Sequence, residues 1–322
     1  MKLGVFTVLF GAKPFEETLD YVKSLGVDAV EIGCGGYPGD AHCKPAQLLA
    51  RGEAAVKAFK KAVTSRGLII SALSCHGNPL HPDPKVAKEH HQAFVNTCKL
   101  AKGLGVTRVI TFSGCPGGSE QDKVPNWIVA PWPGDHAEAL AWQWEKKVIP
   151  YWKEAAKIAK ENGVTHICLE MHPNFVVYNP ESLLRLRAAV GNVIGANFDP
   201  SHLFWQGIDV CAAIRAIGPA IYHVHAKDCR IYEDNARING VLDTKPYTEE
   251  PKRSWIFRTV GYGHGESEWR DIVSTLRMVG YDHVLSIEHE DSLMSGDEGL
   301  KKAIAFLKNV LIYEKAGEAY WA

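Results

Sequence analysis

Four acidic or imidazole side chains stand where apolar, β-branched runs end in the second half of the chain. They are Glu170 in ICLEMHP, Asp199 in ANFDPSH, His225 in HVHAKD and Glu288 in LSIEHE. If the runs are strands of one parallel barrel, their carboxyl ends meet at the same mouth. Three carboxylates buried together repel one another and take up protons unless a cation neutralises them. The pattern therefore predicts one bound divalent metal ion.

The donor types narrow the choice of metal. Carboxylate oxygens with a single imidazole suit Mn²⁺ best, with Mg²⁺, Co²⁺, Fe²⁺ and Zn²⁺ as alternatives. Each residue alone is common at a strand end, as a cap, a turn former or a core histidine. The prediction therefore depends on four successive strand ends carrying such a residue.

Further polar side chains follow the same predicted strands, and we expect them to bind the hydroxyl and carbonyl groups of a substrate. They are His76, His172, His202 and Lys227. His172 and Lys227 each lie two residues beyond a proposed metal ligand, so strand alternation directs them to the same side. His202 lies three residues beyond another proposed ligand and can lean back over the site.

Eight strands alternating with helices must position these residues. The strands are predicted at 2–9, 27–32, 68–73, 108–112, 165–170, 193–198, 221–225 and 284–288. The helices are predicted at 14–25, 52–66, 84–104, 136–162, 180–190, 209–217, 267–279 and 297–313. A glycine stands between helix and next strand at Gly26, Gly67, Gly105, Gly163, Gly218 and Gly280. Strand followed by helix, eight times, predicts an α/β fold, the (β/α)8 TIM barrel.

The pattern continues without a linker, so residues 1–322 are predicted to form a single barrel domain. Two connections after strands are long, at 113–135 and 228–265, and long ordered loops in compact domains commonly serve as lids. They carry aromatic residues that we expect to be exposed: Trp127, Trp132, Trp255 and Tyr262. Such residues can close over a substrate or contact another subunit.

Composition excludes several classes of protein. Lys and Arg number 36 against 37 Asp and Glu, a net charge of −1, so no global field attracts nucleic acid or an anionic membrane. The apolar N-terminal run is too short to cross a bilayer and shows no clear signal-peptide cleavage site. Eight scattered cysteines without a CxxC pair indicate buried thiols in a reducing compartment. We therefore expect a cytoplasmic protein.

The segments LEMHP, FDPSH, HVHAKD and SIEHE resemble the xylose-isomerase-like barrel superfamily of sugar phosphate isomerases and epimerases. The resemblance extends over essentially the whole chain. It implies that the four residues bind the metal and that Glu170 and Glu288 also move protons on opposite faces of the substrate carbon. It further implies a sugar or polyol substrate and proton abstraction next to a carbonyl.

Two departures from the family pattern favour an alternative activity. The ketose epimerases have a further glutamate after the first metal ligand, whereas the corresponding segment MHPNFVVYN has none, and residues 228–265 are longer than in compact epimerases. The chain also resembles a subgroup that acts on 3-keto sugars and glycosides, including the catalytic subunit of C-glycoside deglycosidases. In that subgroup the same site would act as a lyase, driving elimination beside a carbonyl.

Two other hypotheses belong to different classes of protein. An endonuclease IV-like DNA repair enzyme needs additional metal ligands and a basic surface, which the balanced charge argues against. A sugar-binding subunit without catalysis conflicts with the intact set of acidic residues. A homo-oligomer and a complex with a small partner subunit both stay open.

Overall fold

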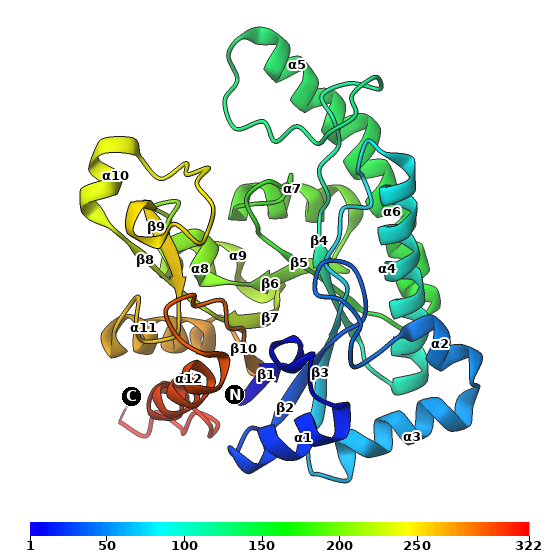
Figure 1. Cartoon of the computed structure of the whole chain (residues 1–322), viewed down its shortest axis with the longest axis vertical. Coiled ribbons are helices and arrows are strands. Elements are labelled where there is room, and N and C mark those ends of the chain that lie inside the picture. The colour runs from blue at the N-terminus through cyan, green and yellow to red at the C-terminus, as the bar shows by residue number, and fades with distance from the viewer. Residues whose placement is uncertain (322) are drawn as a thin grey trace.

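Eight parallel strands close into a barrel in the computed structural model, which describes residues 1–321 (Figure 1). They are β1 (Lys2–Phe6), β2 (Ala29–Gly33), β3 (Ile69–Ser74), β4 (Arg108–Phe112), β5 (His166–Glu170), β6 (Ile194–Phe198), β7 (Ile221–Ala226) and β10 (Val284–Ile287). The hydrogen-bonded order is β1-β10-β7-β6-β5-β4-β3-β2, and β2 returns to β1. The predicted TIM barrel is confirmed.

Helices surround the strands on the outside of the barrel (Figure 1). They are α1 (Phe15–Ser24), α2 (Pro45–Ala50), α3 (Glu53–Thr64), α4 (Pro84–Leu104), α5 (Gly134–Trp142), α6 (Ile149–Glu161), α7 (Pro180–Val190), α8 (Pro200–Phe204), α9 (Val210–Ile217), α10 (Glu233–Asn239), α11 (Glu266–Met278) and α12 (Gly296–Val310). The six glycines expected between helix and strand all have positive φ, from 54° to 86°. None of the helices in residues 1–321 is both long enough and apolar enough to span a membrane.

Two predicted elements differ in kind from the structure, and the ends of the others shift by at most three residues. The first strand ends at Phe6 and not at residue 9; its last pairs are Val5 with Ile287 of β10 and Phe6 with Glu31 of β2. Thr7–Phe10 instead form a 3-10 turn, η1, in which Thr7 and Phe10 are buried. The predicted helix 136–162 is divided by a π-helical turn, η2 (Gln143–Val148), just before Pro150, whose nitrogen cannot donate a helical hydrogen bond.

The connection after β7 contains its own antiparallel ribbon. β8 (Asp228–Ile231) pairs with β9 (Trp255–Arg258), and the short 3-10 turn η4 (Glu250–Lys252) precedes the second strand. The expectation that Trp255 is exposed is wrong. Its ring stacks on Trp205 at a centroid distance of 4.6 Å, and its Nε1 donates to a backbone carbonyl, so the ribbon buries it against the barrel.

Asp228 anchors this ribbon to the loop that leads into α11. Its buried carboxylate accepts hydrogen bonds from the backbone amides of Gly261, Gly263 and His264 at 2.9–3.2 Å. It also accepts from the indole of Trp269 at 3.2 Å and contacts the His264 ring at 2.7 Å. A Cβ at position 263 would lie 2.4 Å from the Asp228 carboxylate, so only glycine allows this approach.

We expect Asp228→Asn to lower the free energy of unfolding by about 3 kcal/mol, because one of the two acceptor oxygens becomes an NH2 group, so the buried donors that face it lose their partner, and the remaining bonds lose the negative charge of their acceptor. The measurement is the urea midpoint, with the slope of the transition unchanged. Asp271→Asn, at an exposed position of α11, is the matched control and should change stability by less than about 0.5 kcal/mol. Equal midpoints for the two variants would contradict this role.

Candidate metal centre

The four residues predicted as metal ligands come together at the carboxyl ends of their strands. One donor atom from each of Glu170, Asp199, His225 and Glu288 lies within 4.8 Å of the others. His225 Nδ1 is 3.1 Å from Glu170 Oε2 and 3.1 Å from Glu288 Oε2. The first three side chains are fully buried and that of Glu288 is 15% exposed, so the cluster is open on one side.

Local structure explains why the carboxylates of Glu170 and Asp199 point inward. Glu170 ends β5 and is paired in register with Asn197 of β6, whose side-chain amide donates to its Oε2 at 2.9 Å. Asp199 caps α8, and its Oδ1 accepts from the backbone amide of Ser201 at 2.8 Å. Capping uses one oxygen of this aspartate and leaves Oδ2 directed at the cluster.

Two buried atoms at the centre make no hydrogen bond of normal geometry. They are His225 Nδ1 and Asp199 Oδ2, although charged neighbours lie within 3.3 Å of each. Buried polar atoms are almost always paired, so such atoms need an explanation. A divalent cation coordinated by three carboxylates and an imidazole accounts for both atoms, and the donor chemistry fits that group.

The histidines predicted to bind substrate lie close to Glu170. His202 Nε2 is 3.1 Å from Glu170 Oε1 and 3.3 Å from Asp199 Oδ2, so it leans back from α8 as expected. His76 Nε2 is 3.1 Å from Glu170 Oε2. The His172 ring lies 4.1 Å from that of His202, and burial lowers the pKa of His172 to about 3.

Lys227 was predicted from the sequence only to bind substrate, but in the structure it pairs with three carboxylates at the site. Its buried ammonium lies 3.2 Å from Asp199, 2.8 Å from Glu288 and 3.0 Å from Glu290. Burial alone would lower its pKa, but the three carboxylates raise it well above its usual value. Phe257 of β9 covers the ammonium at 4.6 Å from its ring centroid. The ribbon after β7 therefore contacts the site through this residue.

Charge partners keep the central carboxylates ionised. Burial raises the pKa of Glu170, but the imidazoles of His202, His225 and His76 outweigh this and hold it well below its usual range. Lys227 and His225 have the same effect on Glu288, whose pKa is also lowered. Both glutamates are therefore ionised, as a metal ligand or a general base must be.

A cavity of about 170 Å³ opens on the cluster. Its walls are Phe6, Val8, Tyr37, Pro38, His76, Phe112, Glu170, His172, Lys227, Glu288 and Glu290. Apolar and aromatic faces line one part and charged groups the other, which is the usual character of a small-ligand site. Residues 113–135 contribute nothing to these walls in the part of the chain that the structure describes; Trp127 and Ile128 line a separate cavity of about 200 Å³.

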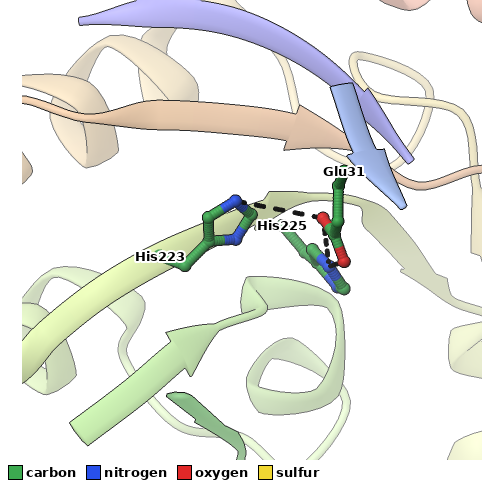
Figure 2. A group of neighbouring side chains, drawn as sticks. All are labelled: Glu31, His223 and His225. Atoms are coloured by element: carbon green, nitrogen blue, oxygen red, sulfur yellow. Dashed lines mark hydrogen bonds and ion pairs between the residues drawn. The ribbon is translucent and has the colours of Figure 1, made fainter. Parts of the chain in front are cut away.

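Tyr37 and Glu31 are among the contributors to the site that were not found from the sequence. Tyr37 reaches the cavity because Gly36 packs on the backbone of His76; a Cβ at Gly36 would lie 1.9 Å from that carbonyl oxygen. Glu31 of β2 is fully buried and lies 3.0 Å from His225 Nε2 (Figure 2). One feature of the sequence indicates this role: Glu31 is a carboxylate inside the apolar run AVEIG, where an ionised group needs a partner.

Comparison with known proteins agrees with the fold. Residues 19–310 match the protein-family model described as "Xylose isomerase-like TIM barrel". The chain is 41% identical over 313 residues to the uncharacterised protein YfiH of Bacillus subtilis (strain 168), covering 97% of this chain and 99% of that protein.

Solved structures with 17–20% sequence identity share the barrel. A D-tagatose 3-epimerase-like protein has a TM-score of 0.64 at 20% identity, covering 96% of this chain and 98% of its own. The IOLI protein with a bound zinc atom has a TM-score of 0.65 at 18% identity, covering 97% of this chain and 98% of its own. The probable 3-DHS dehydratase AsbF of Bacillus anthracis has a TM-score of 0.64 at 17% identity, covering 96% of this chain and 99% of its own. At such identities these neighbours show the fold that is common to them.

Proposed function

Because the chain belongs to the xylose isomerase-like TIM barrel family, we propose that it is a divalent-metal-dependent isomerase or epimerase of a sugar or polyol. The observation that carries the proposal is the convergence of three carboxylates and an imidazole on one point beside a cavity, with His225 Nδ1 and Asp199 Oδ2 lacking hydrogen bonds. The solved epimerase-like structure with this fold supports the sugar substrate.

Glu170 and Glu288 are the proposed acid and base. They come from β5 and β10, which stand on either side of β6 and β7 in the barrel, so they approach a bound ligand from different directions. One carboxylate takes the proton from the carbon next to a carbonyl, and the other returns a proton to the opposite face or to the neighbouring carbon. A bound divalent ion would lower the energy of the negative charge that develops on the substrate oxygen.

The remaining polar groups orient the substrate. Lys227 and His76 line the cavity, and His172 completes its polar wall. Their nitrogens can hold hydroxyl and carbonyl oxygens of a polyol while Phe6 and Phe112 pack on the carbon skeleton. No arginine lines this cavity within residues 1–321, which favours a ligand without a phosphate group.

The test uses purified protein, a panel of ketopentoses, ketohexoses, inososes and 3-keto-glycosides, and saturating Mn²⁺ in D₂O. Proton NMR should show deuterium entering the carbon next to the carbonyl, together with an isomer of unchanged composition. Exhaustive chelation should abolish turnover, and added Mn²⁺ should restore it. Full turnover after chelation would sink the metal-dependent mechanism.

Elimination is the second candidate, supported by the dehydratase among the similar folds and by the missing second glutamate in MHPNFVVYN. The same proton abstraction would then expel a neighbouring oxygen or carbon substituent. The two candidates differ in the mass of the product, since elimination releases water or an aglycone. The panel above therefore distinguishes them in one experiment.

A further inference from the structure

A second group of polar side chains, made up of Glu31, His223 and His225, is buried inside the barrel (Figure 2) and shares His225 with the four-residue cluster. Glu31 of β2 faces His225 and His223 of β7 across the barrel, although three strand-to-strand steps separate β2 from β7. His225 Nε2 is 3.0 Å from both carboxylate oxygens of Glu31. The hydroxyl of Ser74 donates to Glu31 Oε1 at 2.5 Å.

This second group differs from the four-residue cluster, because its atoms are already paired. His223 Nδ1 lies 2.9 Å from Asn197 Oδ1, and its Nε2 lies 3.3 Å from the hydroxyl of Ser71. His223 is 3.9 Å from Glu31, beyond hydrogen-bond distance. A second cation among Glu31, His223 and His225 would have to displace these bonds. The geometry therefore favours a support for His225 over a second metal site.

We propose that Glu31 is a positioning residue that keeps the proton of His225 on Nε2 and so leaves Nδ1 free to bind the metal ion. The two nitrogens of an imidazole cannot both be unprotonated, and the partner of one nitrogen decides the state of the other. Ser74 fixes the Glu31 carboxylate, and Phe6 stacks on the His225 ring at a centroid distance of 5.7 Å. The ring is thus held in orientation and in tautomer. This inference rests on the proposed metal-dependent function.

The experiment is Glu31→Gln, which keeps the size of the side chain but can offer its amide hydrogens to Nε2 and so favour the wrong tautomer. We expect wild-type protein to bind one Mn²⁺ per chain and the variant to bind it about 10–100-fold more weakly, measured by competition with a chromogenic chelator. In protein carrying ¹⁵N-labelled histidine and loaded with Zn²⁺, NMR should show His225 protonated on Nε2, and this signal should change in the variant.

A second variant keeps the proposal testable if Glu31→Gln fails to fold. Ser74→Ala removes the hydroxyl that orients Glu31 and should weaken binding in the same direction by a smaller factor. Unchanged Mn²⁺ affinity in Glu31→Gln, with one ion bound in the wild type, would overturn the role of Glu31 alone. Two ions per wild-type chain and one in the variant would assign Glu31 to a second metal site. A wild-type chain that binds no ion would instead refute the proposed function.

Discussion

Glu288→Gln should lose turnover by at least about 10³-fold while the protein stays folded, since a general acid or base contributes about 10²–10⁴-fold and this residue is also a proposed ligand. Of the two glutamates, Glu288 is the better one to substitute, because its variant disturbs fewer buried contacts. Its side chain is 15% exposed at the edge of the cavity, and Lys227 and His225 are the two basic groups that lie close to its carboxylate within residues 1–321. A glutamine there can still reach the cation through its carbonyl oxygen, so the variant separates proton transfer from metal binding.

Glu170→Gln should lose turnover as well, but with a larger effect on folding. Its two oxygens face the nitrogens of His76 and His202 and the amide of Asn197 at 2.9–3.1 Å. A glutamine would keep one acceptor oxygen and direct amide hydrogens at the donors that face the other position, leaving those buried groups without partners. Loss of activity in this variant is therefore informative only together with its unfolding midpoint and its metal content.

The matched control for Glu288→Gln is Glu290→Gln. Glu290 lies two residues further on, is half exposed, lines the same cavity and pairs with the same lysine, but it is not among the four donors. It should lower kcat/KM by less than about tenfold, measured at saturating Mn²⁺ with metal content determined for each preparation. If Glu288→Gln with bound metal keeps a tenth of the wild-type turnover, the assignment of Glu288 as a proton carrier is wrong.

Lys227→Met should destabilise the metal-free protein by about 3–5 kcal/mol, the usual cost of removing one partner from a buried ion pair. The ammonium lies within 3.2 Å of Asp199, Glu288 and Glu290, so its removal leaves three carboxylates facing one another. A divalent ion supplies the missing positive charge. Mn²⁺ should therefore raise the Tm of the variant more than that of the wild type, because ligands stabilise the state that binds them.

The measurement is thermal unfolding of chelator-treated protein with and without Mn²⁺. Lys157→Met is the control, because Lys157 forms an exposed pair with Glu154, and such pairs contribute about 0–1 kcal/mol. Equal shifts of Tm on adding Mn²⁺ to the wild type and to Lys227→Met would contradict the view that lysine and metal neutralise the same carboxylates. Turnover of Lys227→Met should also fall, since the lysine lines the cavity.

The convergence of Glu170, Asp199, His225 and Glu288 could be predicted from the sequence alone. Each follows or ends an apolar run, and in a parallel barrel all strand ends of one polarity meet at the same mouth. Strand alternation was also sufficient to direct Lys227 toward the same side as His225. Those inferences need only the order of elements and the period of a strand.

Contacts across the barrel depend on closure and register, which local patterns do not specify. Glu31 lies 194 residues from His225 in sequence, and the two meet only because β2 and β7 face each other inside a closed barrel. The burial of Trp255 likewise depends on the β8–β9 ribbon folding back onto Trp205. In the same way, the place of Lys227 among three carboxylates required the register of β7 against its neighbours.

The sequence by itself determined the barrel and the chemical types at its mouth, since the period of a strand and the composition of its end are local properties. Only the tertiary structure decided which atoms are left without partners and which side chains support the donors. The physical reason is that pairing of buried charges depends on distances of a few ångströms between strands far apart in the chain.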